Sequence, residues 1–461
     1  MALYRCGVTK DSLSLDCCFE RDETHVRAWS RAVGEAFLAP HGLGSASAAY
    51  CVRGDEARVK DVTRCAEVHA WPGALGKAGG VVKAAPFPVF LASVQPKGHP
   101  LHSFPLEFTP YYSALPARFE ARTHFGRNKL TLGGVCVEPF GVNAEPTPDG
   151  AEVLKVTERK VVERKEVAES DGDDDAAAVC LRSHWTVPLE QVAGVSSGFI
   201  AQTMVDSQRE GMWELLGNDE LNLFSPDGGQ SAEFPVGDGA GTDNLGLLSA
   251  VRRGCERILV CYNFSRPFVA DSGARLYQGP AGTQLFAKHY SYFARLWGRA
   301  GKVPKWGKVT PWARGSEATK MTLESFNAHT QVFKTEDFDP FVAEIEAAAS
   351  AREPVIVRRS LEVLPNASVG VTGGFVTEML FVAVTDSAEF REALPKETDA
   401  WLTEHYADAK KQGAFPYLKT MQLKYEPELV SLLSQLASWT VAKASGAIEE
   451  LFGDDAAGDQ L

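Results

Sequence analysis

The stretch FPVGDGAGTDNLGLLSAVRRGCERILVCYNF, residues 234–264, predicts a glycine-rich loop, a short helix and a buried strand in succession. Asp243 or Asn244 can cap the helix, because either side chain accepts hydrogen bonds from the free amides of a first turn. Gly254 suits the left-handed conformation that ends a helix, and the apolar strand 258–264 follows at once. Ligands gather at strand-to-helix loops in open α/β sheets, so this loop is the first place to expect a site.

Apolar stretches elsewhere in the chain predict an α/β fold. PVFLASV (88–94) and RILVCYNF (257–264) are short, continuous and β-rich, as in the buried strands of a parallel sheet. Apolar residues recur at helical spacing in 27–38 and in 426–444, which predicts two core-facing helices. This alternation predicts a three-layer α/β/α architecture with a mostly parallel central sheet and helices on both of its faces.

The composition predicts a folded intracellular protein. Of the 461 residues, 44% are hydrophobic and 23% are charged, which is enough for a sizeable core. The net charge of −13 argues against nucleic acid as a partner and against general attraction to anionic membranes. The nine cysteines show no CxxC spacing, and neither a secretory signal nor a run of ~20 apolar residues is visible. We therefore expect a cytoplasmic protein with, at most, peripheral membrane contact.

We expect a single domain over residues 1–461, with two poorly ordered parts. Residues 154–178 include a basic–acidic mixture and an acidic run, which bury too little apolar surface to offset the entropy of ordering. A charged, mobile insertion is predicted there. The tail 452–461 is rich in Gly and Asp and is expected to fray.

Four motifs occur in an order that resembles one enzyme family. Asp-Gly-x-x-x-x-Asn-Leu (238–245) precedes a short helix, Arg-Arg-Gly and an apolar strand ending in Phe-Ser. The others are PFPVFLASVQPKG, PLEFTPYY and HFGRNKLTLGG within 86–134, AGVSSGFIAQ at 193–202, and FPYLKTMQLKYEPELVSLLSQLASW at 415–439. Together they resemble the catalytic domain of cytosolic phospholipase A2 and fungal phospholipase B, in the part that bears the catalytic aspartate.

The resemblance implies a patatin-like or lysophospholipase-like fold and a Ser–Asp dyad that hydrolyses the acyl esters of phospholipid or lysophospholipid. Asp238 then matches the general base, while Gly239 and Asn244 match residues that bind substrate. A carboxylate with the ordinary pKa of about 3.9 is a weak base, so the site must raise that pKa, for example by burial. We expect no cofactor, and the ten histidines show no paired spacing that predicts a metal.

The serine nucleophile is the missing part of this resemblance. The family carries Gly-Gly-Gly-x-Arg and Gly-Leu-Ser-Gly-Ser motifs before the matched region, and neither string occurs here. Ser196 lies in the Gly-x-Ser-x-Gly string 194–198, but the preceding VPLEQVA suits a helix or loop better than the strand of a nucleophile elbow. HGLGSASAAY (41–50), with Ser45 and Ser47, is another candidate in a different order. The simplest account is a chain that begins downstream of the serine, with a fold incomplete at its N-terminus.

Other functions stay open on the residues alone. The missing motifs favour a catalytically inactive relative that binds lipid or contacts another subunit. Asp-Gly is also a common turn, so Asp238 can be only a cap, and Asp227 in SPDGGQ is interpreted as a surface turn. A nucleotide-binding α/β protein rests only on the glycine-rich turn, which no Gly-Lys-Ser/Thr follows. The sequence predicts no oligomeric state.

Overall fold

The chain forms two compact units in the part that the structure describes. The computed structural model describes residues 30, 33–39, 48–51, 56–57, 60, 67–70, 88–96, 103–109, 112–122, 129–137, 144–146, 156–157, 160–161, 181–183, 187–197, 220–226, 230–265, 290–302, 322–406, 414–418 and 425–453. Described residues up to Thr242 belong to the N-terminal unit, and those from Asp243 on belong to the C-terminal unit. The single domain over 1–461 stays a prediction, because one domain can hold more than one compact unit.

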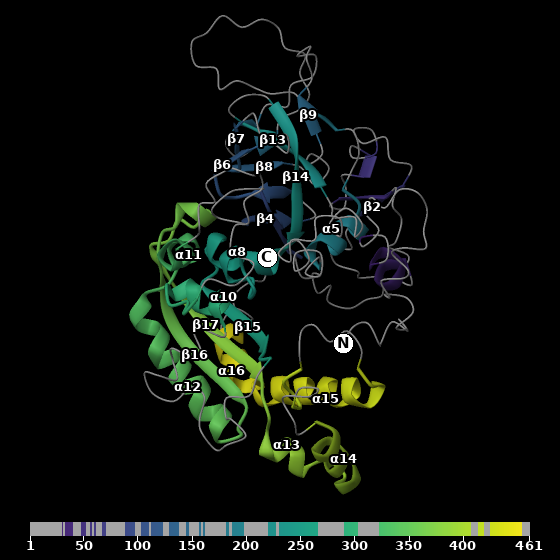
Figure 1. Ribbon diagram of the computed structural model, residues 1–461, viewed down its shortest axis with the longest axis vertical. Helices are drawn as coiled ribbons and strands as arrows, with labels where there is room; N and C mark the ends of the chain where they lie inside the picture. The colour runs from purple at the N-terminus through teal and green to yellow at the C-terminus, as the bar shows by residue number, and fades with distance from the viewer. Residues whose placement is uncertain are drawn as a thin grey trace, which may run out of the picture. The chain divides into compact units, whose positions relative to one another are not determined.

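The N-terminal unit is built on a six-stranded sheet in which every neighbouring pair of strands is antiparallel. In spatial order the strands are β13 (Glu220–Ser225), β14 (Gln230–Asp238), β3 (Phe90–Val94), β4 (Phe104–Phe108), β5 (Ser113–Leu115) and β8 (Val135–Val137). Figure 1 shows β13 and β14 side by side in this sheet. The prediction of a mostly parallel central sheet, and with it the patatin-like or lysophospholipase-like fold, is therefore wrong.

The apolar stretch 88–94 forms strand β3, but between two antiparallel neighbours. Its residues Ala92 and Val94 are buried in one core with residues of β4 and of helix α5 (Leu189–Ser196). A strand that is covered on both faces gives a continuous apolar run whichever way its neighbours point. The run therefore predicted the strand correctly and its pairing direction wrongly.

Smaller elements complete the N-terminal unit. The pairs are β1 (Ala48–Cys51) with β2 (Glu67–Ala70), which is parallel, and the antiparallel β6 (Phe119–Arg122) with β7 (Lys129–Leu132), β9 (Ala144–Pro146) with β12 (Leu181–Ser183), and β10 (Val156–Thr157) with β11 (Lys160–Val161). The predicted helix 27–38 is described at Ser30 and from Val33 on, where the π-helix η2 (Gly34–Leu38) lies. Apart from β10 and β11, the predicted insertion 154–178 lies outside the described residues.

The C-terminal unit contains a three-stranded mixed sheet. Strand β17 (Phe375–Val384) lies in the middle, parallel to β15 (Arg257–Asn263) and antiparallel to β16 (Val355–Val363). The helical elements of this unit are α8 (Leu247–Arg252), α10 (Ser291–Ala294), η5 (Arg295–Trp297), α11 (Leu323–Thr330), η7 (Thr335–Asp337), α12 (Phe338–Ser350), η8 (Ala367–Val369), α13 (Ala388–Glu392), α14 (Lys396–Tyr406), α15 (Pro427–Lys443) and α16 (Ser445–Phe452).

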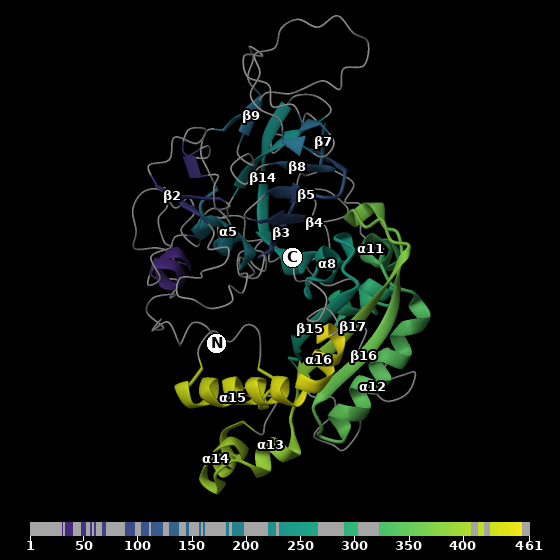
Figure 2. The same cartoon turned by 180° about the vertical axis from the view of Figure 1, so that it is seen from behind.

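Helices cover both faces of this mixed sheet. Helix α12 packs along β16, and its apolar side joins Val357 and Phe381 in the largest core of the unit (Figure 1). On the other face, Leu380 and Val382 pack with Leu451 of α16, which lies against β15 and β17 (Figure 2). The strands alternate their side chains between the two cores, as the pleat of a sheet requires.

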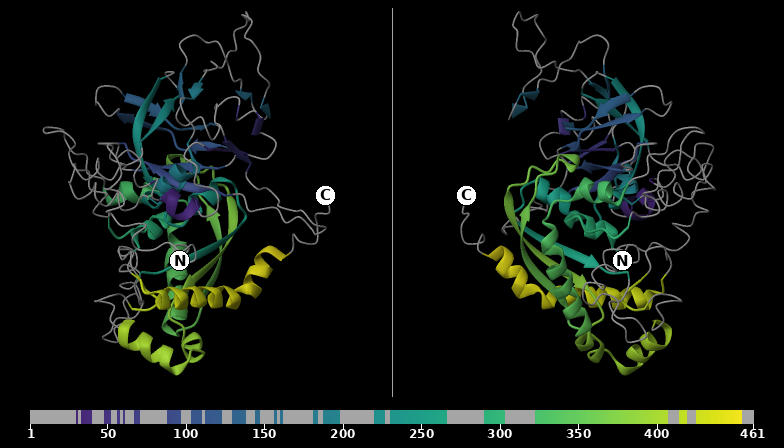
Figure 3. Two further views of the ribbon diagram at one scale, coloured as in Figure 1. Left: turned by 90° about the vertical axis from the view of Figure 1, so that its right-hand side faces the viewer. Right: turned by 60° about the vertical axis from the view of Figure 1, so that its left-hand side comes forward.

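The helix predicted near the C-terminus is confirmed as α15. Leu429, Leu432, Leu433 and Leu436 are buried, because spacings of three and four residues place them on one side of the helix. Pro427 stands in its first turn, where no amide partner is required. Figure 3 shows α15 and α16 as two consecutive helices with a bend between them. Of the predicted frayed tail 452–461, only Phe452 and Gly453 lie among the described residues.

Candidate functional site

Asp238 is the last residue of β14 and the first residue of a tight glycine-rich turn. Its backbone pairs with Ala92 of β3, and its side chain caps the 3-10 turn η4 (Gly239–Gly241). The Ala240 amide donates to Oδ1 of Asp238 at 2.7 Å. Among the described residues, no donor makes a hydrogen bond to Oδ2. The backbone therefore holds one carboxylate oxygen, while the other accepts no hydrogen bond from the described part of the chain.

Glycines allow the turn to approach β3 closely. A Cβ atom added to Gly239 would lie 2.7 Å from the backbone carbon and oxygen of Leu91, closer than real Cβ atoms come. One added to Gly237 would lie 2.5 Å from Nε2 of Gln95. The predicted substrate-binding residue Gly239 thus has a visible packing role, since a larger residue would push the turn off the sheet.

Burial gives the Asp238 carboxyl group the acidity of a general base near neutral pH. Loss of solvent raises its pKa from the ordinary 3.8 to about 6, and the hydrogen bond from the Ala240 amide opposes this rise in part. A base works best when its pKa lies near the operating pH. The raised pKa that the dyad chemistry requires is therefore present at Asp238.

Hydroxyl groups surround the turn, but they donate to backbone carbonyls or to one another. Ser93 Oγ donates to the carbonyl oxygen of Asp238 at 2.8 Å, and Ser103 Oγ donates to the carbonyl oxygen of Gly241 at 3.0 Å. Thr242 Oγ1 donates to Ser103 Oγ at 3.2 Å. These contacts fix both ends of the turn, and none of them activates a hydroxyl group against the Asp238 carboxylate.

Glu107 is a second acid of this sheet, with 2% of its surface exposed, whereas Asp238 is half-buried. The register pairs Glu107 with Leu91, whereas Asp238 pairs with the next residue, Ala92. Successive residues of a strand point to opposite faces of the sheet. Asp238 and Glu107 therefore face opposite sides and do not form a pair of catalytic carboxylates.

Ser196, a candidate nucleophile from its Gly-x-Ser-x-Gly string, is the last residue of α5. A nucleophile elbow places its serine between a strand and a following helix, whereas here the helix precedes the serine. The neighbouring Ser197 hydroxyl donates to the Ala193 carbonyl at 2.8 Å, as is common at a helix end. The alternative candidates Ser45 and Ser47 lie outside the described residues.

Asn244, the second predicted substrate-binding residue, belongs to the C-terminal unit. Its side chain makes a hydrogen bond with Tyr262 of β15. Burial raises the pKa of Tyr262 to about 12, and the bond with Asn244 opposes that rise. The visible role of Asn244 is to hold the start of α8 near this strand.

The N-cap position of α8 is Gly246, with φ of +76°, and not Asp243 or Asn244, the two residues predicted for it. Asp243 instead holds the start of α8 from three residues before this position. Its two carboxylate oxygens accept the amides of Leu245 at 2.9 Å and Leu248 at 2.6 Å. Burial raises the pKa of Asp243, while these amides and the nearby guanidinium groups of Arg295 and Arg252 oppose the rise. Both oxygens are occupied, so this carboxylate has a structural role that the sequence alone indicated only in part.

The far end of α8 follows the prediction. Gly254 has φ of +68°, and its amide donates to the Val251 carbonyl at 3.1 Å. The Cys255 amide reaches back to the Ala250 carbonyl at 3.2 Å. These two bonds are the Schellman arrangement that ends helices at a left-handed residue.

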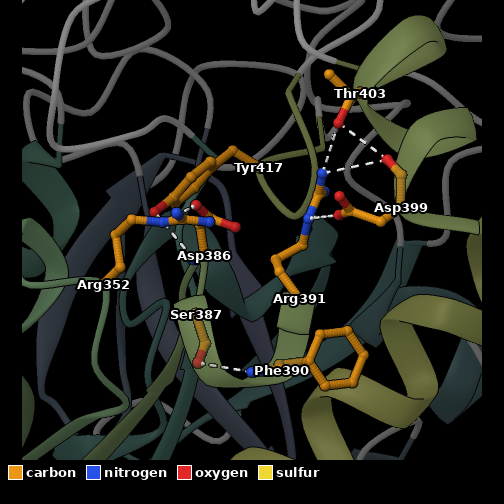
Figure 4. Close-up of polar contacts among 8 residues, drawn as sticks. All are labelled: Arg352, Asp386, Ser387, Phe390, Arg391, Asp399, Thr403 and Tyr417. Carbon is orange, nitrogen blue, oxygen red and sulfur yellow. Dashed lines mark hydrogen bonds and ion pairs between the residues drawn. The ribbon is translucent and has the colours of Figure 1, made fainter. Parts of the chain in front are cut away.

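A second group of polar residues surrounds α13, and Figure 4 shows its contacts. Arg352 Nε donates to Asp386 Oδ2 at 2.8 Å, and Arg391 forms an ion pair with Asp399 and donates to Thr403 Oγ1 at 2.8 Å. Each carboxylate already pairs with an arginine. This group therefore ties loops to helices and offers no open acid or base.

Comparisons of the chain with protein-family models, with curated proteins and with solved structures find no match. None of the helices in the described ranges combines the length and the apolar character needed to cross a lipid bilayer. The same residues contain no group of three or more His, Cys, Asp or Glu side chains placed to hold a metal ion.

Proposed function

We propose that the chain is a carboxylic-ester hydrolase that acts on phospholipid or lysophospholipid, with Asp238 as its general base. The observation that carries the proposal is one carboxyl group. Burial raises the pKa of Asp238 to about 6, one of its oxygens is held by the Ala240 amide, and the other accepts no hydrogen bond from a described residue. The aspartate motif at 238–245 supplies the substrate class. The antiparallel sheet and the comparisons lend it no support.

The mechanism follows from a base of this strength. Asp238 takes the proton of a serine hydroxyl as that oxygen attacks the acyl carbonyl, whose π electrons move onto its oxygen. The tetrahedral intermediate collapses, the lipid alcohol leaves with the proton from Asp238, and an acyl-serine remains. Water then gives a proton to Asp238 and attacks the acyl-serine. The fatty acid leaves, and the proton returns to the serine.

The test compares ester hydrolysis by the wild-type chain and by Asp238→Ala, with lysophosphatidylcholine and a nitrophenyl ester as substrates. We expect kcat/KM to fall by roughly 10²–10⁴-fold, as is usual when a general base is removed. Asp339→Asn is the matched control, because Asp339 is an exposed partner of Arg299 in another part of the chain. Equal rates for the wild type and Asp238→Ala would remove Asp238 from the mechanism.

A second candidate is a catalytically inactive relative that binds lipid or contacts another subunit. The observation that favours it is the occupation of the hydroxyls around Asp238, since Ser93, Ser103 and Thr242 all donate elsewhere. A fluorophosphonate probe separates the two candidates. Stoichiometric labelling of the pure protein supports the hydrolase and identifies the serine, and labelling at Ser196 would overturn its interpretation as a helix end outside the site. Absence of labelling supports the inactive relative.

A further inference from the structure

We propose that Ser93 is a positioning residue for the Asp238 carboxylate, acting through the backbone and not on the substrate. This inference rests on the proposed role of Asp238 and adds to it the residue that keeps the base in place. The Ser93 hydroxyl donates to the carbonyl oxygen of Asp238 at 2.8 Å, from a strand that pairs with β14 over its last three residues. A fixed carbonyl fixes the peptide plane that begins the turn, and with it the direction of the side chain.

The sheet register separates Ser93 from the carboxylate itself. Ser93 pairs with Gly237, and Asp238 pairs with Ala92, so the Ser93 and Asp238 side chains point to opposite faces of the sheet. Ser93 is also completely buried, with 0% of its surface exposed. It can therefore neither attack a substrate nor share a proton with the carboxylate, and its effect must pass through the Asp238 backbone.

Gln95 orients the Ser93 hydroxyl for this role. Its Nε2 donates to Ser93 Oγ at 3.2 Å. A serine hydroxyl has a single proton to donate. Because the Ser93 oxygen accepts a hydrogen bond from Gln95 on one side, its proton points away from Gln95 and toward the Asp238 carbonyl oxygen. The chain of contacts runs from Gln95 through Ser93 to the Asp238 carbonyl, and it needs Gly237 because a side chain there would strike Gln95.

Charged groups on the neighbouring elements do not account for the state of Asp238. Strand β3 has no titratable residue, while α5 and β13 contribute Glu190 and Glu220, and β4 contributes Glu107 on the other face. None of these raises the pKa of Asp238, whose rise has burial as its cause. Whatever holds the carboxyl group in its buried position therefore governs its acidity.

The experiment is a pH titration of the Asp238 carboxyl carbon by NMR on the full chain labelled at the aspartate carboxyl carbons, with Asp238→Asn to assign the signal. In Ser93→Ala the turn loosens and water reaches the carboxylate. We expect its pKa to fall from about 6 toward 3.8, by about one pH unit. Ser93→Thr keeps a hydroxyl and should restore the pKa.

Ser113→Ala is the matched control. Ser113 is a buried serine of the same sheet, and its hydroxyl has no hydrogen-bond partner in the described part of the chain. Removing that hydroxyl should leave the pKa of Asp238 unchanged. If Ser93→Ala and Ser113→Ala give the same pKa as the wild type, the proposal is overturned.

A second variant covers the case in which Ser93→Ala does not fold. Gln95→Met alters a half-buried side chain and removes the donor that orients Ser93. A smaller fall in the pKa of Asp238 supports the proposal, and an unchanged pKa contradicts it. The titration is independent of turnover, so an inactive Asp238 site would defeat the proposed function and still leave the role of Ser93 decided.

Discussion

Replacing Asp243 by alanine should destabilise the C-terminal unit, because this carboxylate accepts two backbone amides at the start of α8 and its charge acts on the buried guanidinium of Arg295. Arg295 is 2% exposed, and its guanidinium lies 4.6 Å from the ring centre of Tyr292 and 4.7 Å from that of Phe326. Burial lowers the pKa of Arg295 to about 10, while the charge of Asp243 acts in the opposite direction. The two groups therefore stabilise each other's charged forms inside the core.

The size of the effect follows from two losses. The charge of Asp243 favours the charged form of the fully buried Arg295 guanidinium, so its removal leaves that guanidinium less compensated, at a cost of ~1–3 kcal/mol. Loss of the cap on the Leu245 and Leu248 amides adds ~0.5–2 kcal/mol. Since neighbouring effects are not additive, we expect Asp243→Ala to lower the free energy of unfolding by about 3 kcal/mol. Asp243→Asn keeps one acceptor and should lose less.

Hydrogen exchange in increasing urea, followed by mass spectrometry, measures this effect locally. Peptides from β15 and β17 report the unfolding free energy of the unit that contains Asp243. Asn244→Ala is the comparison variant, because it removes a single hydrogen bond, to Tyr262, beside the same helix start and should cost within about 1 kcal/mol. If Asp243→Ala changes the unfolding free energy no more than this variant, the buried pair does not carry the stability assigned to it.

Three further variants test the turn and one helix. Asp238→Asn should be more stable than the wild type by about 1–3 kcal/mol at pH 8. The pKa of Asp238 is raised in the folded state, so the neutral carboxyl group contributes its full share to wild-type stability below pH 3.8, and this share is lost as the pH rises through about 6. The prediction is contradicted if the melting temperatures of the wild type and Asp238→Asn differ by the same amount at pH 4 and at pH 8. Gly239→Ala should lower stability by about 1–3 kcal/mol in thermal melts because its Cβ strikes the Leu91 backbone, and a neutral result would disprove the close approach. Gly446→Ala should raise stability by ~0.5–1 kcal/mol, because alanine favours a helix over glycine and no atom lies within 4 Å of the added Cβ in α16. A lower melting temperature than that of the wild type would show that the added methyl group clashes.

Local features were predictable from the sequence because their causes lie within a few residues. The buried leucines of α15 recur every three or four positions. Gly254 follows the end of α8, where the backbone adopts the left-handed conformation that glycine favours. The role of Asp243 as an acceptor for the first turn of α8 follows from the same local logic, although the N-cap position itself is Gly246. Each depends on the geometry of a single helix, which periodicity and residue type report directly.

The sequence contained a sign that neighbouring strands of the six-stranded sheet are antiparallel, but we interpreted it only as a turn. The four residues PDGG (226–229) separate β13 from β14, and these strands are antiparallel neighbours. A short loop that contains Asp-Gly between two β-rich segments is a hairpin signal. Because this loop was interpreted only as a surface turn at Asp227, the prediction of a parallel sheet, which the apolar run 88–94 suggested, was not revised.

The partners of the candidate site could not be read from the sequence, since they are distant along the chain. Ser93 meets Asp238 only after two strands have paired, and Asp243 meets Arg295 only in the folded core. Neither pairing leaves a local pattern. The raised pKa at Asp238 was a requirement of the proposed chemistry, and its cause became visible only with the burial of the turn.

The parallel pairing of β15 with β17 imposes an order of events during synthesis. The segment RILVCYNF leaves the ribosome long before its partner, because Arg257 pairs with Glu378 across ~120 residues of chain. At ~5–20 residues per second, the nascent strand waits roughly 6–24 seconds for the segment that will cover it. An apolar β-rich segment held open for that time is a natural target for a chaperone at the ribosome exit, and the yield of folded protein should depend on one being present.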